Sequence, residues 1–354
     1  MHQAGASDLH IGDGYAPILR INGALEITKH RVLSADKVKI LLYEMLSDQQ
    51  IQALEEIGEI DFTYTVPEIA RFRMNIYKKH EGLGAAFRII PNRIPTFESL
   101  GLPEVLKKVL SHKSGLILVT GPTNSGKTTT LAAMVDYLNE IMNYHIITLE
   151  DPLEYIHPNK NCLINQRQIG QHSHSFASAL RAALREDPNV ILVGEMRDNE
   201  TISLALTAAE TGLLVLGTLH TRSAVQTISR IVDVFPANQQ DRVRIALSEV
   251  LVGTCCQQLV KRADGNGRVA VLEIMLKTSA ISNLIRESKG QQITNALVTG
   301  RQLGMQTLEH HLKELVSQKI ITAEEAVRYT DNPHEILAMS KNSPADKTLG
   351  QKTT

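Results

Sequence analysis

The sequence contains no tryptophan and only three cysteines, Cys162 and the adjacent pair Cys255 and Cys256. Three is an odd number, and none of these cysteines has the C-x-x-C spacing that is typical of zinc sites. We therefore expect neither a disulfide framework nor a zinc centre. Reduced thiols in a cytoplasmic protein are the simpler interpretation.

Long apolar runs and an excess of either charge are also missing. Apolar stretches such as residues 115–119 and 213–216 fall far short of the roughly 18 residues that a membrane-spanning helix needs. The N-terminus has no basic segment followed by an apolar one, so we expect no secretion signal. Lysine and arginine number 37 against 38 acidic residues, without a basic block, which argues against nucleic acid as a partner.

At 354 residues the chain is longer than one hydrophobic core usually serves, which predicts two domains. We expect residues 1–92 to form a compact α+β module. Apolar residues at helical spacing behind Ser34 predict one amphipathic helix over residues 34–56. Alternating side-chain character predicts strands at residues 62–66, 71–77 and 84–90. Two prolines, Pro91 and Pro95, then indicate a linker over residues 93–98.

From residue 99 to residue 340, apolar runs alternate with longer helical stretches, which predicts an α/β domain with a parallel sheet flanked by helices. A helix over residues 129–142 follows the first strand, and the pattern becomes mostly helical beyond Thr278. Thr322 and Glu325 form a capping box that begins a late helix. We expect the polar tail, residues 341–354, to be frayed. The predicted strands are residues 116–120, 145–150, 190–194 and 213–219.

Residues 121–128 match the phosphate-binding pattern G-x-x-x-x-G-K-[ST] at every defined position, between an apolar strand and a helix. Glycine at 121 and 126 lets the backbone turn tightly and aim N–H groups at phosphate oxygens. Lys127 is expected to neutralise the phosphates of ATP, and the Thr128 hydroxyl to bind Mg²⁺ at the start of the helix. We assign ATP binding to Gly121, Pro122, Thr123, Asn124, Ser125, Gly126, Lys127, Thr128 and Thr129.

The predicted strand at residues 190–194 is followed directly by Glu195. P-loop proteins present an acidic residue in this way to the Mg²⁺ and γ-phosphate region. We interpret Glu195 as the general base or water-orienting residue, with an ordinary surface glutamate as the alternative. Gly194 stands where aspartate is more usual, so we expect Thr128, phosphate oxygens and water to share the binding of the metal.

Two further strand ends carry candidate catalytic residues. The acidic segment 150–154 follows a predicted strand, and Glu154 is a candidate for ordering metal-bound water, with a solvated acidic turn as the alternative. His220 closes the strand at residues 213–219 and is a candidate sensor of the γ-phosphate, with a structural histidine as the alternative. Glu195, Glu154 and His220 are therefore our catalytic candidates, and both glutamates are expected to reach the metal through water.

The combination of these motifs resembles the secretion ATPase superfamily of type II secretion and type IV pili, and within it the pilus retraction ATPases. The P-loop alone is generic, whereas the ordered set is specific and spans nearly the whole chain. Short length and the absence of a four-cysteine insert favour the retraction members. The segments that carry the resemblance are residues 5–10, 121–128, 147–154, 180–188, 193–198, 208–212, 218–221, 281–287 and 303–308.

The resemblance implies an N-terminal PAS-like domain followed by a RecA-like P-loop ATPase domain, assembled as a homohexamer that uses ATP and Mg²⁺. It further implies a cytoplasmic motor for pilus retraction and twitching motility, docked at the inner membrane on a pilus platform protein. Arg71, Arg73 and Arg88 match the family's nucleotide-facing strands, so we expect one or more to reach the phosphates. A solvated or salt-bridged sheet face is the alternative for each arginine.

Three other functions stay open, one of them a nucleotide-gated scaffold that binds ATP without hydrolysing it. Within the superfamily, the chain would be a pilus-extension or type II secretion ATPase. Outside it, the chain would be a nucleic-acid translocase, because RecA-like sheets also move strands, although no aromatic-rich basic groove is evident.

Three positions depart from the pattern of the resembled family. Ser282 replaces an arginine of the retraction segment, which bears on retraction itself. Leu213 replaces a histidine and Asn189 replaces a common aspartate. We expect these last two departures to affect the response to nucleotide rather than the fold.

Overall fold

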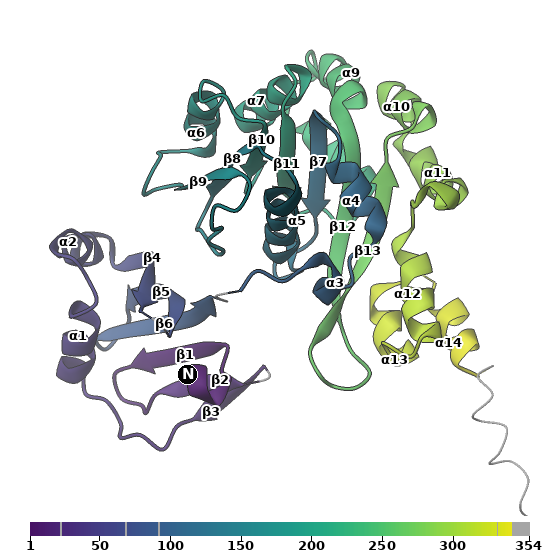
Figure 1. Cartoon of the computed structure of the whole chain (residues 1–354). Helices are drawn as coiled ribbons and strands as arrows, with labels where there is room; N and C mark the ends of the chain where they lie inside the picture. Colours follow the sequence, from purple (N-terminus) through teal and green to yellow (C-terminus); the bar gives the residue numbers. More distant parts are fainter. Residues whose placement is uncertain (22, 68, 91–92, 331, 342–354) are drawn as a thin grey trace, which may run out of the picture. The chain divides into compact units, whose positions relative to one another are not determined.

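The computed structural model describes residues 1–21, 23–67, 69–90, 93–330 and 332–341. The chain divides into two compact units, a smaller one of Met1–Arg93 with Glu154–Ile156 and a larger one of the other described residues (Figure 1). Pro91 lies outside the described residues. So do residues 342–354 of the tail that we expect to be frayed. No described helix is long and apolar enough to cross a membrane.

The smaller unit is an antiparallel six-stranded sheet in the order β3-β2-β1-β6-β5-β4, with two helices. Val38 and Leu42 of the first helix share a core with Met74 and Ile76 of β5. The three predicted strands are confirmed, each to within three residues. The elements are η1 (His2–Ala4), β1 (Asp8–Gly12), β2 (Ile18–Ile21), β3 (Ala24–Ile27), α1 (Ala35–Tyr43), α2 (Asp48–Ile57), β4 (Glu59–Val66), β5 (Ala70–Lys78) and β6 (Leu83–Ile90).

The prediction of one helix over residues 34–56 is wrong, because the structure has two helices there. Ser34 does precede α1, but that helix ends at Tyr43. Ser47 then begins α2 through a capping box: its hydroxyl accepts from the Gln50 backbone, and the Gln50 side chain accepts from the Ser47 N–H at 2.9 Å. Both helices bury apolar residues in the same core, so periodicity alone did not reveal the break.

The larger unit contains a seven-stranded sheet in the order β13-β12-β7-β11-β10-β8-β9. All neighbours are parallel except β12 and β13, which form an antiparallel pair. The four predicted strands are confirmed as β7, β8, β10 and β11, whereas the other three were not predicted. The strands are β7 (Gly115–Thr120), β8 (His145–Glu150), β9 (Leu163–Gln168), β10 (Val190–Val193), β11 (Leu214–Leu219), β12 (Leu251–Lys261) and β13 (Arg268–Leu276).

Helices cover both faces of this sheet, which is why its central strands read as continuous apolar runs. Leu116 and Leu118 of β7 join one core, and Ile117 and Val119 join the other. α3 (Phe97–Leu100), α4 (Glu104–Leu110) and α5 (Lys127–Ile141) contribute to the second core. The first core takes residues from α6 (Phe176–Ala183), α7 (Asn199–Glu210), α8 (Ala224–Asp233), α9 (Gln240–Val250), α10 (Ser279–Arg286) and α11 (Ile293–Thr299).

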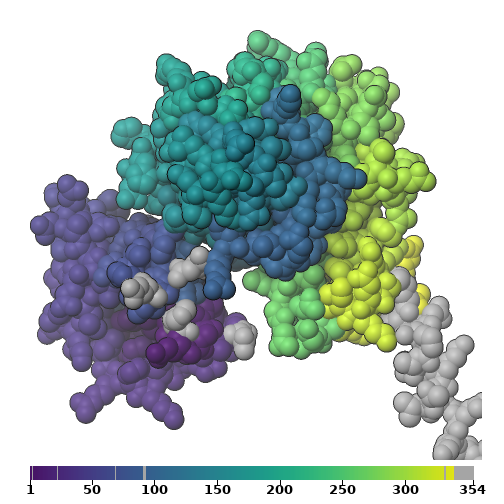
Figure 2. Space-filling view, in the orientation of Figure 1, coloured from purple at the N-terminus to yellow at the C-terminus, as the bar shows by residue number. Residues whose placement is uncertain are grey.

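The C-terminal helices form a separate cluster around the far end of the β12–β13 pair. Val260 and Val271 of these strands pack against Leu312 and Ala326. The yellow C-terminal segments form one side of the larger unit in the space-filling view (Figure 2). The elements here are α12 (Leu308–Ser317), α13 (Ala323–Ala326), α14 (Pro333–Lys341) and the short helices η2 (Gly290–Gln292), η3 (Arg301–Leu303) and η4 (Val327–Tyr329).

Asn189 and Leu213 lie at the amino edge of the sheet, just before β10 and β11. The six residues of β11 separate this edge from the phosphate-binding loop by about 20 Å. The Asn189 side chain accepts a hydrogen bond from the His145 backbone N–H at 2.8 Å and so ties β10 to the start of β8. Asn189 therefore has a role in the fold, which we did not expect, and the effect of Asn189 and Leu213 on the response to nucleotide stays a prediction.

His157 is a buried histidine in the segment between β8 and β9. It is 8% exposed, and its Nδ1 has no hydrogen-bond partner among the described residues. Burial lowers the pKa of His157 to about 4, an effect that Asp136 opposes and Lys160 reinforces. An unfolded histidine has a pKa near 6.5. As pH falls from about 6.5 towards about 4, the unfolded chain takes up a proton that the folded chain does not, so stability decreases.

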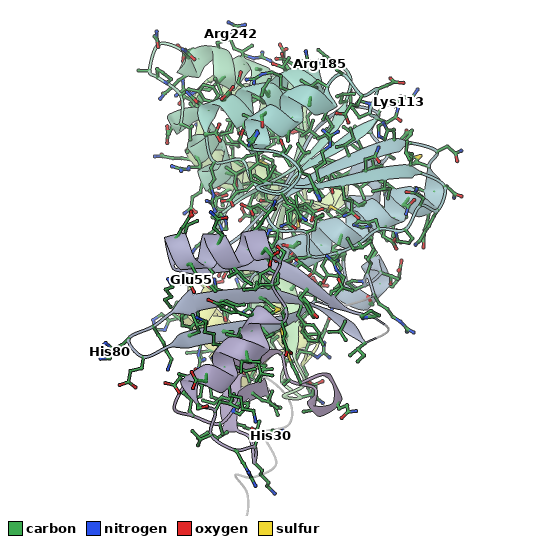
Figure 3. The ribbon with its side chains drawn as sticks, turned by 90° about the vertical axis from the view of Figure 1, so that its left-hand side faces the viewer. His30, Glu55, His80, Lys113, Arg185 and Arg242 are labelled. Atoms are coloured by element: carbon green, nitrogen blue, oxygen red, sulfur yellow. The ribbon has the colours of Figure 1, made fainter. Side chains whose placement is uncertain are left out.

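His157→Gln is expected to remove this acid sensitivity, which amounts to about 2 kcal/mol at pH 5. Melting temperatures of nucleotide-free protein at about pH 7.5 and about pH 5 measure it, and the wild type should lose more on acidification than the variant. His80, an exposed histidine at the edge of the smaller unit (Figure 3), supplies the control variant His80→Gln, which should behave as the wild type. Equal acid sensitivity in His157→Gln and wild type would contradict the assignment.

Candidate active site

The phosphate-binding loop begins where the fully buried strand β7 ends at Thr120. Gly121 has a φ of +149° and Gly126, which precedes α5, has a φ of +87°, so both adopt conformations that favour glycine. A side chain on Gly121 would also overlap with the backbone carbonyl of Gln257 on β12. Glycine at 121 is therefore required by the close approach of a neighbouring strand as well as by the turn.

The polar groups of this loop suit a polyphosphate. The Lys127 ammonium donates to the carbonyl oxygens of Gly121 at 2.8 Å and Pro122 at 3.0 Å, which holds a positive charge against the loop. The Ser125 hydroxyl is buried and has no partner among the described residues. Thr128 is half-buried in the first turn of α5. A cation, a free hydroxyl and the positive end of a 15-residue helix therefore meet at one place.

Glu195 and His220 come together although they are 25 positions apart in the sequence. Glu195 closely follows β10, His220 follows β11, and these two strands are parallel neighbours. The Glu195 carboxylate lies 3.0 Å from the His220 Nε2 and also accepts a hydrogen bond from Arg197. This bond to Glu195 raises the pKa of Arg197. Because β7 lies on the other side of β11, the pair stands one strand away from the phosphate-binding loop.

Thr218 fixes the backbone on both sides of Glu195. Its hydroxyl donates to the carbonyl oxygen of Gly194, and its own carbonyl accepts from the Met196 N–H at 3.0 Å. Thr218 is 5% exposed, so both bonds are shielded from water. β11 therefore fixes the backbone that carries Glu195 through two bonds, and His220 at its end contacts the carboxylate.

The structure explains why Gly194 replaces the more usual aspartate. A Cβ at position 194 would lie 2.9 Å from the carbonyl oxygen of Leu149 and 3.2 Å from the Cα of Glu150. No side chain fits there without moving β8. Glu150 itself ends β8 as a buried carboxylate that accepts from the Thr148 hydroxyl at 2.7 Å. A second carboxylate therefore stands at this sheet edge, but on the neighbouring strand.

The other candidates belong to the smaller unit. Glu154 lies in the connection between β8 and β9. Arg71 and Arg73 lie on β5, and Arg88 lies on β6 directly opposite Arg73. Arg73 pairs with Asp61 at 3.4 Å, and Arg88 pairs with Asp8 at 2.8 Å. Arg73 and Arg88 are therefore salt-bridged on the sheet in this structure, as the alternative interpretation expected. The role of Glu154 and the three arginines at the ATP site stays a prediction.

The described residues contain no group of three His, Cys, Asp or Glu side chains arranged as a metal centre. Mg²⁺ in nucleotide enzymes is usually held by one or two protein oxygens together with phosphate oxygens and water. The Thr128 hydroxyl in the first turn of α5 and the Glu195 carboxylate fit that chemistry, because both present oxygen donors at the carboxyl edge of the sheet.

Comparison with known proteins identifies the family of the chain. The family model described as "Type II/IV secretion system protein" matches residues 3–331. The type IV pilus retraction ATPase PilT of Pseudomonas aeruginosa is 52% identical over 322 residues, which cover 91% of this chain and 93% of that protein. A twitching motility protein of Neisseria gonorrhoeae is 49% identical over 316 residues, which cover 89% of this chain and 84% of that protein.

Structural similarity extends over both units. The crystal structure of the pilus retraction motor PilT with bound ADP matches with a TM-score of 0.88 at 47% sequence identity, over 95% of this chain and 96% of that one. Sequence and structure thus agree over almost the full length, and we conclude that the chain belongs to the type II/IV secretion system protein family.

Proposed function

We propose that this chain is an ATP-hydrolysing motor subunit that powers retraction of type IV pili, and with it twitching motility. The main evidence for ATPase activity is that Lys127, Glu195 and His220 lie at the ends of three neighbouring parallel strands. The pilus assignment rests on 52% identity to a protein named as a retraction ATPase. In this proposal the smaller unit is a PAS-like domain and the larger unit is a RecA-like ATPase domain.

ATP binds to the phosphate-binding loop through its triphosphate. The Lys127 ammonium exchanges the carbonyl oxygens of Gly121 and Pro122 for phosphate oxygens, which are stronger acceptors because they are charged. When bound, Mg²⁺ would neutralise charge on the β and γ phosphates. The Thr128 hydroxyl would hold the ion, and Glu195 and Glu154 would act on it through water.

Hydrolysis requires a group that orients and deprotonates water, and Glu195 takes this role. Thr218 fixes its backbone, while Arg197 and His220 fix its carboxylate. His220 therefore links the water-activating residue to the end of β11, next to the phosphate-binding loop. In this proposal His220 senses the γ-phosphate by hydrogen bonding.

The active assembly in this proposal is a homohexamer in the cytoplasm, docked at the inner membrane on the pilus platform protein. Closure of the smaller unit brings one or more of Arg71, Arg73 and Arg88 to the phosphates. Arg73 and Arg88 would then exchange their aspartate partners for phosphate oxygens. Loss of the γ-phosphate reverses that exchange, which couples hydrolysis to movement of the unit.

Glu195→Gln is expected to lower the rate of ATP hydrolysis by about 100-fold or more, because an amide cannot accept the proton of water. ATP binding should persist, since Glu195 does not form the phosphate-binding loop. Lys127→Ala is the complementary variant and should weaken nucleotide affinity by about tenfold or more. Phosphate release and binding of a fluorescent ATP analogue measure the two effects, and wild-type turnover by Glu195→Gln would disprove its role.

Deletion of the gene is expected to leave cells with surface pili that no longer shorten. Live imaging of labelled pili provides the measurement. Wild-type protein should restore shortening, while Glu195→Gln should not. Cells without pili after deletion would instead identify an extension motor, and cells with normal pili but impaired protein export would identify a type II secretion ATPase.

A nucleic-acid translocase would respond differently to added nucleic acid. ATPase activity of a translocase rises when single- or double-stranded DNA or RNA is added, because strand binding and hydrolysis are coupled. The net charge of -1 gives no electrostatic reason for such binding. We expect the turnover rate to be unchanged by either nucleic acid, and a severalfold rise would overturn the pilus assignment.

A further inference from the structure

Gln257 lies beside the phosphate-binding loop on β12, a strand that we did not predict from the sequence. β12 runs parallel to β7, with Cys256 opposite Thr120, so Gln257 stands level with the start of the loop. Its side chain is 3% exposed. A buried amide at this place must satisfy both a donor and an acceptor within the protein.

Both ends of the Gln257 amide bond to the phosphate-binding segment. The Nε2 donates to the carbonyl oxygen of Ser125 at 2.7 Å. The Oε1 accepts from the hydroxyl of Thr130, in the first turn of α5, at 2.7 Å. One side chain thus joins the last part of the loop and the start of the helix, which together present the N–H groups for phosphate.

The bond to Ser125 also sets the direction of a phosphate-binding N–H. In a trans peptide the C=O and the following N–H point in opposite directions. Because Gln257 holds the Ser125 carbonyl towards β12, the Gly126 N–H points away from β12. The site needs that orientation for phosphate binding.

Gln257 packs tightly against the two glycines of the phosphate-binding loop. A Cβ on Gly126 would lie 2.8 Å from the Gln257 Nε2, and a Cβ on Gly121 would overlap with the Gln257 carbonyl oxygen. Both glycines of the phosphate-binding pattern therefore face the same residue. The loop and β12 can approach only because these two positions lack side chains.

We propose that Gln257 is a positioning residue that holds the phosphate-binding loop in its nucleotide-binding shape and thereby sets the affinity for ATP and ADP. Its amide bonds to Ser125 and Thr130, so it acts on the loop through these two residues. The inference rests on the proposed ATP site and names a further residue on which that site depends.

The test compares Gln257→Leu with wild type in the full-length protein, using a fluorescent ADP analogue for affinity and phosphate release for turnover. Loss of the donor to a buried carbonyl should weaken ADP binding by about tenfold and raise KM for ATP by a similar factor. The kcat should change by less than about threefold, because Glu195 and His220 are untouched. A change confined to kcat would overturn the proposal.

Gln258→Leu is the matched control. Gln258 is the next residue of the same strand, so its side chain leaves the opposite face of the sheet, where it lines a groove with Arg222 and Glu273. The affinity of the Gln258→Leu variant for ADP should stay within twofold of the wild-type value. Equal losses in the two variants would show that the effect belongs to the strand and not to Gln257.

Two further variants keep the test informative if Gln257→Leu folds poorly. Thr130→Val removes only one of the two bonds and should weaken ADP binding less than Gln257→Leu does. Gln257→Glu keeps the shape but regains a donor only when protonated, so its affinity should fall as pH rises from about 6 to about 8, relative to wild type. A pH-independent, wild-type affinity of Gln257→Glu would contradict the proposal.

The outcomes separate this inference from the proposed function. Wild-type protein that binds no ADP analogue would remove the ATP site itself. Wild-type protein that binds it, together with a Gln257→Leu variant that is folded and binds equally well, would leave the ATPase intact and remove only the role of Gln257.

Discussion

The close approach of β12 to the phosphate-binding loop is the constraint on which the rest of the site depends. Gly121 and Gly126 lack side chains where Gln257 reaches the loop, and the Gln257 amide spans from Ser125 to Thr130. With the loop packed in this way, α5 begins at Lys127 and directs its N-terminus at the phosphate position. A buried strand thus provides the support that an exposed loop cannot supply by itself.

The parallel sheet then places the remaining chemistry. Its strand order puts β11 next to β7 and β10 next to β11, so residues distant in sequence end at one edge. Glu195 and His220 meet there at 3.0 Å, and Thr218 holds the backbone that carries Glu195. The same packing excludes a side chain at Gly194 and leaves Glu150 of β8 as the neighbouring buried carboxylate.

Local patterns allowed much of this to be predicted from the sequence. The phosphate-binding motif and the strands before Lys127, Glu195 and His220 could be recognised because each signal lies within a few residues. Gln257 could not be recognised, because its partners Ser125 and Thr130 lie more than 120 residues away and only the β7–β12 pairing brings them close. The same limit applies to Asn189, whose bond to His145 depends on the pairing of β8 and β10. The Ser47 capping box, which begins α2 after α1 has ended, is a local signal, but the continuous apolar pattern over residues 34–56 concealed it.

Turnover of ATP at this site is the central property of the proposed motor. The decisive measurement is release of inorganic phosphate by the purified wild-type chain with ATP and Mg²⁺, repeated with a chelator in place of the metal. We predict steady release over many turnovers that stops when Mg²⁺ is removed. Binding of ATP without any phosphate release above background would contradict ATP hydrolysis by this chain and identify a nucleotide-gated scaffold.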